Sequence, residues 1–422
     1  MSEQSQEKAF DAACEQYAAR GVDVHAAFEI LDCVPISLHC WQGDDVAGFE
    51  APDAALSGGG IAVTGNHPGR ARTIDELRLD LEKAFSLIPG HHRLNLHAIY
   101  GDFGGKKVDR DRIGVEHFES WVDWARTRHL GLDFNATCFS HALAESGSTL
   151  SSADEGVRRF WVEHVRRCRE IAAWMGRELG GASIHNLWIP DGTKDATVTR
   201  YERRERLRTS LDEIFLIGYP AESLADSVES KLFGIGSESF VAGSHDFYLA
   251  WALRAGVMVC LDMGHYHPTE SVADKVSSLL PFFDEILLHV SRGVRWDSDH
   301  VVVWSDELRD VAAEIVRAGA LGRVHLALDY FDASLNRVGA WVIGARAALK
   351  AMLFALLEPT ARLREMEAAG DGFGRLAMLE EMKTLPFGTV WDAWCLAKGV
   401  PEGDRWIEAV RDYEETVLSK RS

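Results

Sequence analysis

The 422-residue chain lacks the cysteine pattern of a secreted or zinc-stapled protein. Its seven cysteines are an odd number, are spread from Cys14 to Cys395, and include no Cys-x-x-Cys pair. This usage excludes a disulfide framework, argues against structural zinc, and indicates a reducing compartment. The first ten residues, MSEQSQEKAF, contain no apolar targeting core. We therefore expect a cytoplasmic protein.

No apolar run is long and uncharged enough to suggest a membrane span. The most apolar late stretch, 342–357, contains Arg346 and Lys350, whereas a spanning helix needs about 20 apolar residues. We predict a buried helix there and no membrane partner.

Positive charge is also scarce. The chain has 45 Lys and Arg against 65 Asp and Glu, which gives a net charge of −20. Such a surface repels phosphate backbones, so nucleic acid is not an expected partner. The 46% hydrophobic and 26% charged residues are ordinary for a globular protein and exclude a largely disordered or fibrous chain.

Short apolar runs alternate with longer amphipathic stretches along most of the chain. The predicted strands cover 35–41, 93–100, 131–137, 182–189, 224–231, 257–264, 285–292 and 324–330. The predicted helices include 73–88, 153–179, 244–255, 269–283, 306–318 and 336–357. Eight β/α units are typical of a (β/α)₈ (TIM) barrel of the α/β class. A doubly wound open sheet is the main alternative.

The two ends of the chain predict further helices. We divide the chain into an N-terminal helical segment (1–34), interrupted at Gly21, a barrel (35–357), and a C-terminal helical extension (358–422). The extension is expected to form helices at 362–369, 376–383, 390–397 and 405–418. A barrel does not need them, so contact with another subunit is their obvious use.

Polar residues recur near the ends of the predicted strands: His39, His97, Asn135, Asn186, Asp262, His289 and Asp329. Because strand side chains alternate between faces, Cys260 lies on the same face as Asp262. Leu287 and Ala327 precede His289 and Asp329 by the same two positions. We predict a packed layer of these apolar residues beneath a polar ring at the C-terminal mouth. Each unsatisfied group in such a ring would cost about 1–3 kcal/mol, so the ring needs ligands or a solvated pocket.

Two segments place oxygen and imidazole ligands close together. In LDMGHYHPTE (261–270), Asp262 and His265 flank a turn at Gly264, which suits a divalent metal. The alternative is a helix-capping turn with an incidental histidine. In VRWDSDH (294–300), Asp297 and Asp299 point the same way from an extended loop and repel unless a cation lies between them. The alternative is a pair of solvated aspartates.

The strand around 224–231 can be placed in two ways. Hydropathy alone would draw it through 232–236 and leave Glu229 at its start, but we place it at 224–228, so that Glu229 reaches the mouth with Lys231 beyond it. The alternative for these two residues is a surface ion pair. Trp188, late in the fourth strand, could line a sugar pocket.

Long segments of the chain resemble the L-rhamnose isomerase family: ESKLFGIGSESF, LDMGHYHPTE, LLHVSRGVRWDSDHVV and LDYFDASLNRVGAWVIG, with RLNLHAIYGDFGG and GDDVAGFE earlier. The resemblance covers nearly the whole chain. The family is similar to the xylose isomerase superfamily of (β/α)₈ barrels with two divalent metals.

The resemblance implies a role for each matching position. The first metal would be held by Glu229, Asp262, His289 and Asp329, and the second by His265, Asp297 and Asp299. Catalysis would involve Lys231, Asp297 and Asp329. Substrate would be bound by His97, Trp188 and Lys231, with Val46, Ile61, Ile99 and Phe331 as an apolar wall for a methyl group. Five carboxylates and two imidazoles without a thiolate favour Mn²⁺, Mg²⁺ or Co²⁺, and the resemblance favours Mn²⁺.

The implied activity is isomerisation of L-rhamnose to L-rhamnulose by a metal-assisted 1,2-hydride shift, the first step of rhamnose breakdown, in a homotetramer. The closest alternative is another sugar isomerase or epimerase with the same barrel. A metal-dependent nuclease is disfavoured by the net charge of −20. A catalytically silent metal-binding scaffold would leave Lys231, Asp297 and Asp299 unexplained.

Overall fold

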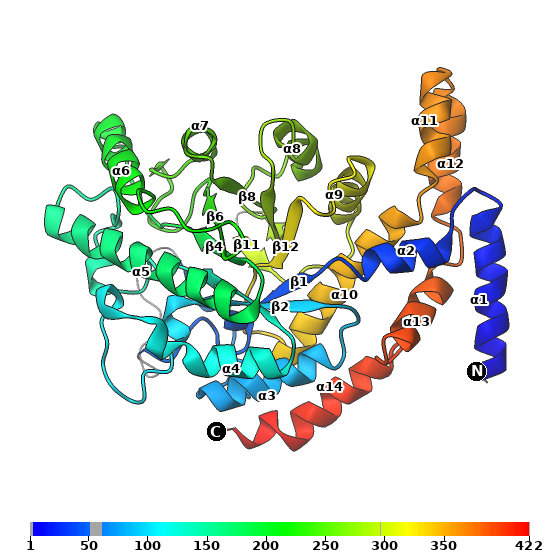
Figure 1. Ribbon diagram of the computed structural model, residues 1–422, viewed down its shortest axis with the longest axis horizontal. Helices are drawn as coiled ribbons and strands as arrows, with labels where there is room; N and C mark the ends of the chain where they lie inside the picture. Colours follow the sequence, from blue (N-terminus) through cyan, green and yellow to red (C-terminus); the bar gives the residue numbers. More distant parts are fainter. Residues whose placement is uncertain (1–2, 51–60, 296, 422) are drawn as a thin grey trace.

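The computed structural model describes residues 3–50, 61–295 and 297–421, and its centre is a closed barrel of eight parallel strands (Figure 1). The barrel order is β1 (Ile36–His39), β12 (Val324–Leu328), β9 (Ile286–Val290), β8 (Met258–Asp262), β6 (Leu224–Glu229), β4 (Ser183–Leu187), β3 (Gly131–Asn135) and β2 (His92–His97). Because β1 pairs with both β2 and β12, the sheet closes. The predicted barrel is confirmed, and the open sheet is excluded.

Helices surround the barrel. They are α3 (Ile74–Phe85), α4 (Glu119–Thr127), α5 (Glu155–Leu179), α6 (Arg200–Ile214), α7 (His245–Ala255), α8 (Val272–Leu279), α9 (Asp306–Arg317) and α10 (Arg337–Leu356). By length and composition α10 could cross a membrane, but 83% of its apolar window is buried inside the protein. Its buried Arg346 donates to the carbonyls of Leu87 and Pro401. This is the predicted buried helix.

Most of the predicted strands were drawn too long at their C-terminal ends, two of them into 3₁₀ turns. The runs at 35–41 and 93–100 leave the barrel early and continue as the 3₁₀ turns Cys40–Gln42 and Ala98–Tyr100. Their apolar side chains are still buried, because they pack within the loops above the barrel rather than in the sheet. The strand placed at 224–228 is confirmed to within one residue, since β6 ends at Glu229.

Two short antiparallel ladders lie outside the barrel. One pairs β5 (Gly192–Thr193) with β7 (Phe240–Val241), and the other pairs β10 (Arg292–Val294) with β11 (Asp297–His300). The second ladder corrects the sequence-based picture of an extended loop, because Asp297 and Asp299 lie on a strand of a hairpin.

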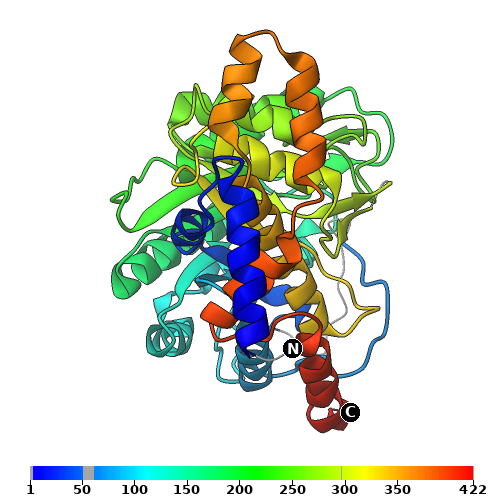
Figure 2. The same cartoon turned by 90° about the vertical axis from the view of Figure 1, so that its right-hand side faces the viewer.

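The terminal segments are helical, as expected. At the N-terminus, α1 (Glu3–Ala18) and α2 (Val24–Leu31) are separated at Gly21, whose φ is +83°. The C-terminal extension contains α11 (Thr360–Ala368), α12 (Gly372–Met382), α13 (Phe387–Ala397) and α14 (Arg405–Thr416). In both views the α11–α12 hairpin projects away from the barrel, while α1 packs along α13 (Figures 1 and 2).

The barrel lumen contains the predicted packed layer. Ile184, Met258, Cys260, Leu287 and Ala327 form a buried cluster of their own inside the sheet. Asp262 and His289 are register neighbours on β8 and β9, two residues beyond Cys260 and Leu287. The apolar layer therefore supports the polar side chains at the C-terminal mouth.

Candidate metal centre and active site

Four side chains from adjacent parts of the barrel converge at the mouth. Glu229 ends β6, Asp262 ends β8, His289 lies in β9, and Asp329 directly follows β12. One ligand atom from each lies within 4.8 Å of all the others. His289 Nδ1 is 3.0 Å from Asp329 Oδ2, 3.4 Å from Glu229 Oε2 and 3.6 Å from Asp262 Oδ2. These are the four residues proposed for the first metal.

The chemistry of this cluster fits a divalent cation. Glu229 and Asp262 are each 3% exposed, and carboxylates buried so close together repel unless positive charge lies between them. Although His289 Nδ1 lies 3.0 Å from Asp329 Oδ2, neither ring nitrogen of His289 makes a hydrogen bond of normal geometry within the described part of the chain. Burial alone would lower the pKa of His289, but the nearby carboxylates of Glu229, Asp262 and Asp329 raise it well above its usual value. The cluster therefore attracts positive charge, which a metal ion coordinated by oxygen and imidazole would supply.

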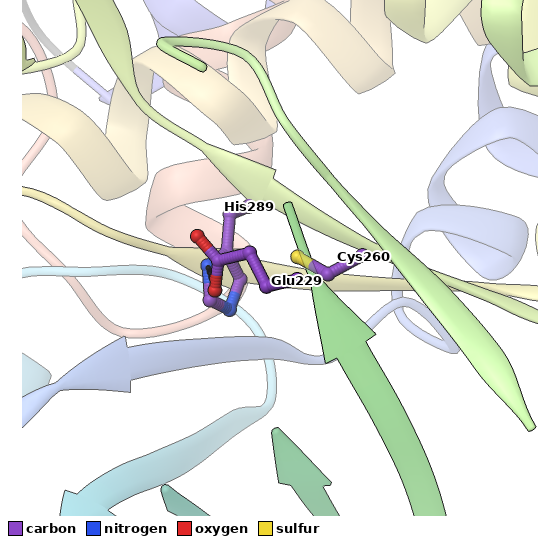
Figure 3. Close-up of side chains that lie close together, drawn as sticks. All are labelled: Glu229, Cys260 and His289. Atoms are coloured by element: carbon purple, nitrogen blue, oxygen red, sulfur yellow. Dashed lines mark ion pairs between the residues drawn. The ribbon is translucent and has the colours of Figure 1, made fainter. Parts of the chain in front are cut away.

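Cys260 lies beside the cluster without being a good ligand for it. Figure 3 shows Glu229 facing His289, with Cys260 alongside on β8. Burial raises the pKa of the Cys260 thiol, so the thiol stays protonated, whereas metals bind the thiolate. Its place in the lumen cluster agrees with the predicted core role.

Neighbouring polar groups orient the carboxylates. Asp262 Oδ1 accepts hydrogen bonds from Ser291 Oγ at 2.6 Å and from the Gly264 amide at 2.7 Å. Trp41 Nε1 donates to Asp329 Oδ1 at 3.2 Å. The sequence pattern did not indicate Ser291 or Trp41, because both lie just beyond strand ends, where no periodicity marks them.

Of the three residues proposed for the second metal, two lie near the carboxylate cluster and the third lies beside a histidine outside it. His265 Nδ1 is 2.9 Å from the Ser230 carbonyl and 3.0 Å from Glu229 Oε1. Asp299 lines a pocket beside the carboxylate cluster, and burial together with the charge of Asp329 raises its pKa to about 6. Asp297 does not line this pocket; its Oδ2 is 3.2 Å from His300 Nε2. The ligand roles of these residues remain predictions.

A pocket adjoins the carboxylate cluster. It is lined by Trp41, Val46, Ile61, His97, Asn135, Phe139, Asn186, Trp188, Glu229, Lys231, His265, Ser298, Asp299, Asp329 and Phe331. Six of the seven proposed substrate-binding residues line it. Ile99 instead lines a neighbouring cavity, to which Val46 also contributes. The candidate site did not include Asn135, Asn186, Phe139 or Ser298, although both asparagines stood out as polar residues late in strands.

The pocket combines aromatic faces with a cation and a neutral imidazole. Lys231 Nζ lies 4.9 Å from the centre of the Trp188 ring. Burial lowers the pKa of His97 to about 3, so its ring is neutral at pH 7, and its Nδ1 is 3.1 Å from Thr137 Oγ1. Hydroxyl groups of a sugar can bond to such polar groups, while its apolar faces pack on the rings.

Val46 reaches this pocket from a strained turn. Its φ is +59° and that of Asp45 is +60°, a conformation that β-branched residues rarely adopt. Asp44 stabilises the turn by accepting hydrogen bonds from Tyr100 Oη at 2.5 Å and from the Gly48 amide at 2.7 Å. Strain of this kind persists only where surrounding contacts hold it.

The fold and this cluster together define a (β/α)₈ barrel with a carboxylate–imidazole cluster that could hold a metal ion and an adjoining polar–aromatic pocket at its C-terminal mouth. Residues 4–421 match the model of the family described as L-rhamnose isomerase (RhaA). The chain belongs to this family.

Relatives similar to the chain along its whole length carry the same name. The L-rhamnose isomerase of Rhodopirellula baltica is 60% identical, covering 99% of this chain and 97% of the relative. That of Bacteroides thetaiotaomicron is 56% identical, covering 98% of each. Among solved structures, an L-ribulose 3-epimerase is 14% identical and covers 74% of this chain and 98% of its own, with a TM-score of 0.46. No functional inference follows from a likeness this distant.

Proposed function

We propose that the chain is an L-rhamnose isomerase, which interconverts L-rhamnose and L-rhamnulose. The observation that carries this proposal is the convergence of Glu229, Asp262, His289 and Asp329 beside a pocket containing Lys231. The relatives described above, which are 56% and 60% identical, bear the name of this activity. The reaction would be the first step of rhamnose breakdown.

The four converging residues would hold one divalent ion, and His265, Asp297 and Asp299 would hold a second. The donor set contains five carboxylates and two imidazoles, which suits Mn²⁺, with Mg²⁺ or Co²⁺ as substitutes. When bound, such ions act as Lewis acids that polarise two neighbouring sugar oxygens.

The chain's own residues would bind and orient the sugar. Lys231 would place its ammonium group near the carbonyl end, where it stabilises negative charge on oxygen. Val46, Ile61 and Phe331 form an apolar wall suited to the C6 methyl group. His97 would exchange hydrogen bonds with hydroxyl groups as a neutral imidazole. Ile99 would support the wall from the neighbouring cavity.

The hydrogen on C2 would cross directly to C1. A base that lifted it as a proton would need to approach to about 2.6–3.2 Å. The carboxylates that line the pocket are Glu229, Asp299 and Asp329, and all three are assigned to metal binding, so none is free for that task. The remaining proton moves from the C2 hydroxyl to O1. Asp297 and Asp329 would take part in this transfer.

The assembly we propose is a cytoplasmic homotetramer. Its support is the projecting α11–α12 hairpin, where Phe373 is 86% exposed and Leu376 is 62% exposed. Large apolar side chains on a protruding hairpin suit contact with another copy. Light scattering of the purified protein should give four times the mass of 46.8 kDa; a monomeric mass would contradict the assembly.

The activity is tested by incubating the purified protein with L-rhamnose and measuring ketose formation. Activity should disappear with EDTA and return when Mn²⁺, Mg²⁺ or Co²⁺ is added back singly. L-Mannose, which carries a C6 hydroxyl in place of hydrogen, is the matched comparison and should give a lower kcat/KM. Epimerisation of a ketose at C3 without aldose turnover would favour the alternative activity.

A further inference from the structure

Asn186, near the end of β4, contacts the carboxylate cluster from outside it. Its Nδ2 donates a hydrogen bond to Glu229 Oε2 at 2.5 Å, and its side chain is almost fully buried, at 2% exposure. A carboxylate oxygen only accepts hydrogen bonds, so the amide nitrogen must face Glu229. The amide oxygen then points elsewhere.

This amide oxygen has no hydrogen-bond partner among the described residues. Asn186 also lines a second cavity, of about 190 Å³, inside the barrel lumen below the mouth. Ser37, Asn95 and Asp133 line the same cavity, so its wall is partly polar. A polar cavity of this size can hold ordered water, which bonds to otherwise unsatisfied buried groups. Asn186 therefore lies between the carboxylate cluster on one side and a partly polar cavity on the other.

The Glu229 carboxylate lies between two histidines, so a hydrogen bond that fixes its orientation matters. Its Oε1 is 3.0 Å from His265 Nδ1, and its Oε2 is 3.4 Å from His289 Nδ1. Rotation about the last side-chain bond would exchange the two oxygens. The hydrogen bond from Asn186 fixes the position of Glu229 Oε2. This oxygen keeps a second lone pair, which can bind a metal ion.

We propose that Asn186 is a positioning residue, whose amide nitrogen fixes the Glu229 carboxylate for metal binding and whose amide oxygen is held by water in the lumen cavity. The inference rests on the proposed metal-dependent function and adds a residue outside the ligand set. Partners that orient metal ligands typically contribute about 10–100-fold to metal affinity.

Asn135 provides a matched control. It lies beside Asn186 on the neighbouring strand β3, in register with it. Both residues line the pocket at the barrel mouth. It is similarly buried, at 4% exposure. Its Nδ2 donates to Asn95 Oδ1 at 2.6 Å rather than to a metal ligand. Replacing Asn135 therefore perturbs the same region without releasing Glu229.

The test is calorimetric titration of Mn²⁺ into the EDTA-treated full-length protein and its Asn186→Leu and Asn135→Leu variants. Asn186→Leu should weaken one of two Mn²⁺ sites about 10–100-fold, whereas Asn135→Leu should stay within about threefold of the parent. Equal Mn²⁺ affinity in the parent and Asn186→Leu would overturn the positioning role. An equal loss in both variants would also overturn it, because the effect would then be general. A parent that binds no Mn²⁺ would instead refute the proposed function.

Two further measurements complete the test. Asn186→Ser is too short to reach Glu229 and should reproduce the loss of Mn²⁺ affinity if the leucine variant fails to fold. A high-resolution crystal structure of the parent should show water within hydrogen-bonding distance of Asn186 Oδ1. A dry lumen cavity would overturn the second half of the proposal.

Discussion

Arg337, the first residue of α10, binds Asp45 through two hydrogen bonds, from Nε to Oδ1 at 3.0 Å and from Nη2 to Oδ2 at 2.7 Å. Its Nη1 also donates to the carbonyls of His67 and Pro68. Arg337 thus joins two parts of the β1–α3 connection to the helix that follows β12. Because Asp45 directly precedes Val46, the same ion pair holds the strained turn that carries Val46 to the pocket.

Arg337→Leu should strongly destabilise the protein. The Arg337 and Asp45 side chains are 2% and 10% exposed, and removing one partner leaves a buried charge unpaired, at a cost of about 3–5 kcal/mol. Chemical denaturation should report a loss of this size. Arg159→Leu, which breaks the exposed pair with Glu155, should leave the midpoint unchanged. Equal midpoints for parent and Arg337→Leu would contradict the role of the pair.

His164 should make stability depend on pH. Its Nε2 accepts from the Thr137 amide, its Nδ1 lies 3.0 Å from the Arg110 carbonyl, and burial lowers its pKa to about 3. An unfolded histidine has a pKa of about 6.5. Between these values the unfolded state binds the proton and the folded state does not, so stability falls as pH falls.

His164→Gln removes this contribution to the pH dependence. The parent should be more stable than the variant at pH 7, and urea denaturation measures the difference between their unfolding free energies. This difference should shrink by about 2 kcal/mol between pH 7 and pH 5. His92, whose pKa burial lowers to about 4, acts in the same direction and remains in both proteins. A difference that is constant with pH would show that His164 is not buried as the neutral form.

Strand periodicity predicted the barrel and the polar ring that contains Asp262, His289 and Asp329. The full set of four ligands, with Glu229, was implied by the family resemblance, because hydropathy alone would have left Glu229 at the start of a strand. A polar residue two positions after an apolar lumen residue must share its face, as Asp262 does with Cys260. The same reasoning could not place Asp297 and Asp299. The hairpin of β10 and β11 depends on pairing between segments, and β11 brings Asp299 to the pocket while Asp297 lies beside His300. The sequence also could not predict the left-handed turn at Val46, because tertiary contacts such as that of Arg337 with Asp45 stabilise it.

Asp299→Asn should reduce isomerase activity by about 100-fold or more, because it removes one anionic ligand of the proposed second metal while keeping the size of the side chain. Elemental analysis at limiting Mn²⁺ should find about one ion per chain, since the first cluster is unaltered. Asp306→Asn, at an exposed position on α9, is the control and should retain activity and both ions. Near-normal turnover of Asp299→Asn at limiting Mn²⁺ would remove Asp299 from the ligand set.

Isomerisation of L-rhamnose in D₂O should leave little deuterium at C1 of the early ketose product. In a hydride shift the hydrogen crosses from C2 to C1 without meeting solvent, whereas an enediol route lifts it as a proton that can exchange with water. The described pocket offers the carboxylates of Glu229, Asp299 and Asp329, and a metal ligand cannot also serve as a freely accessible base at C2. NMR of the ketose at low conversion measures the incorporation directly. Substantial deuterium at C1 would contradict the hydride shift and would require a side-chain base in the pocket.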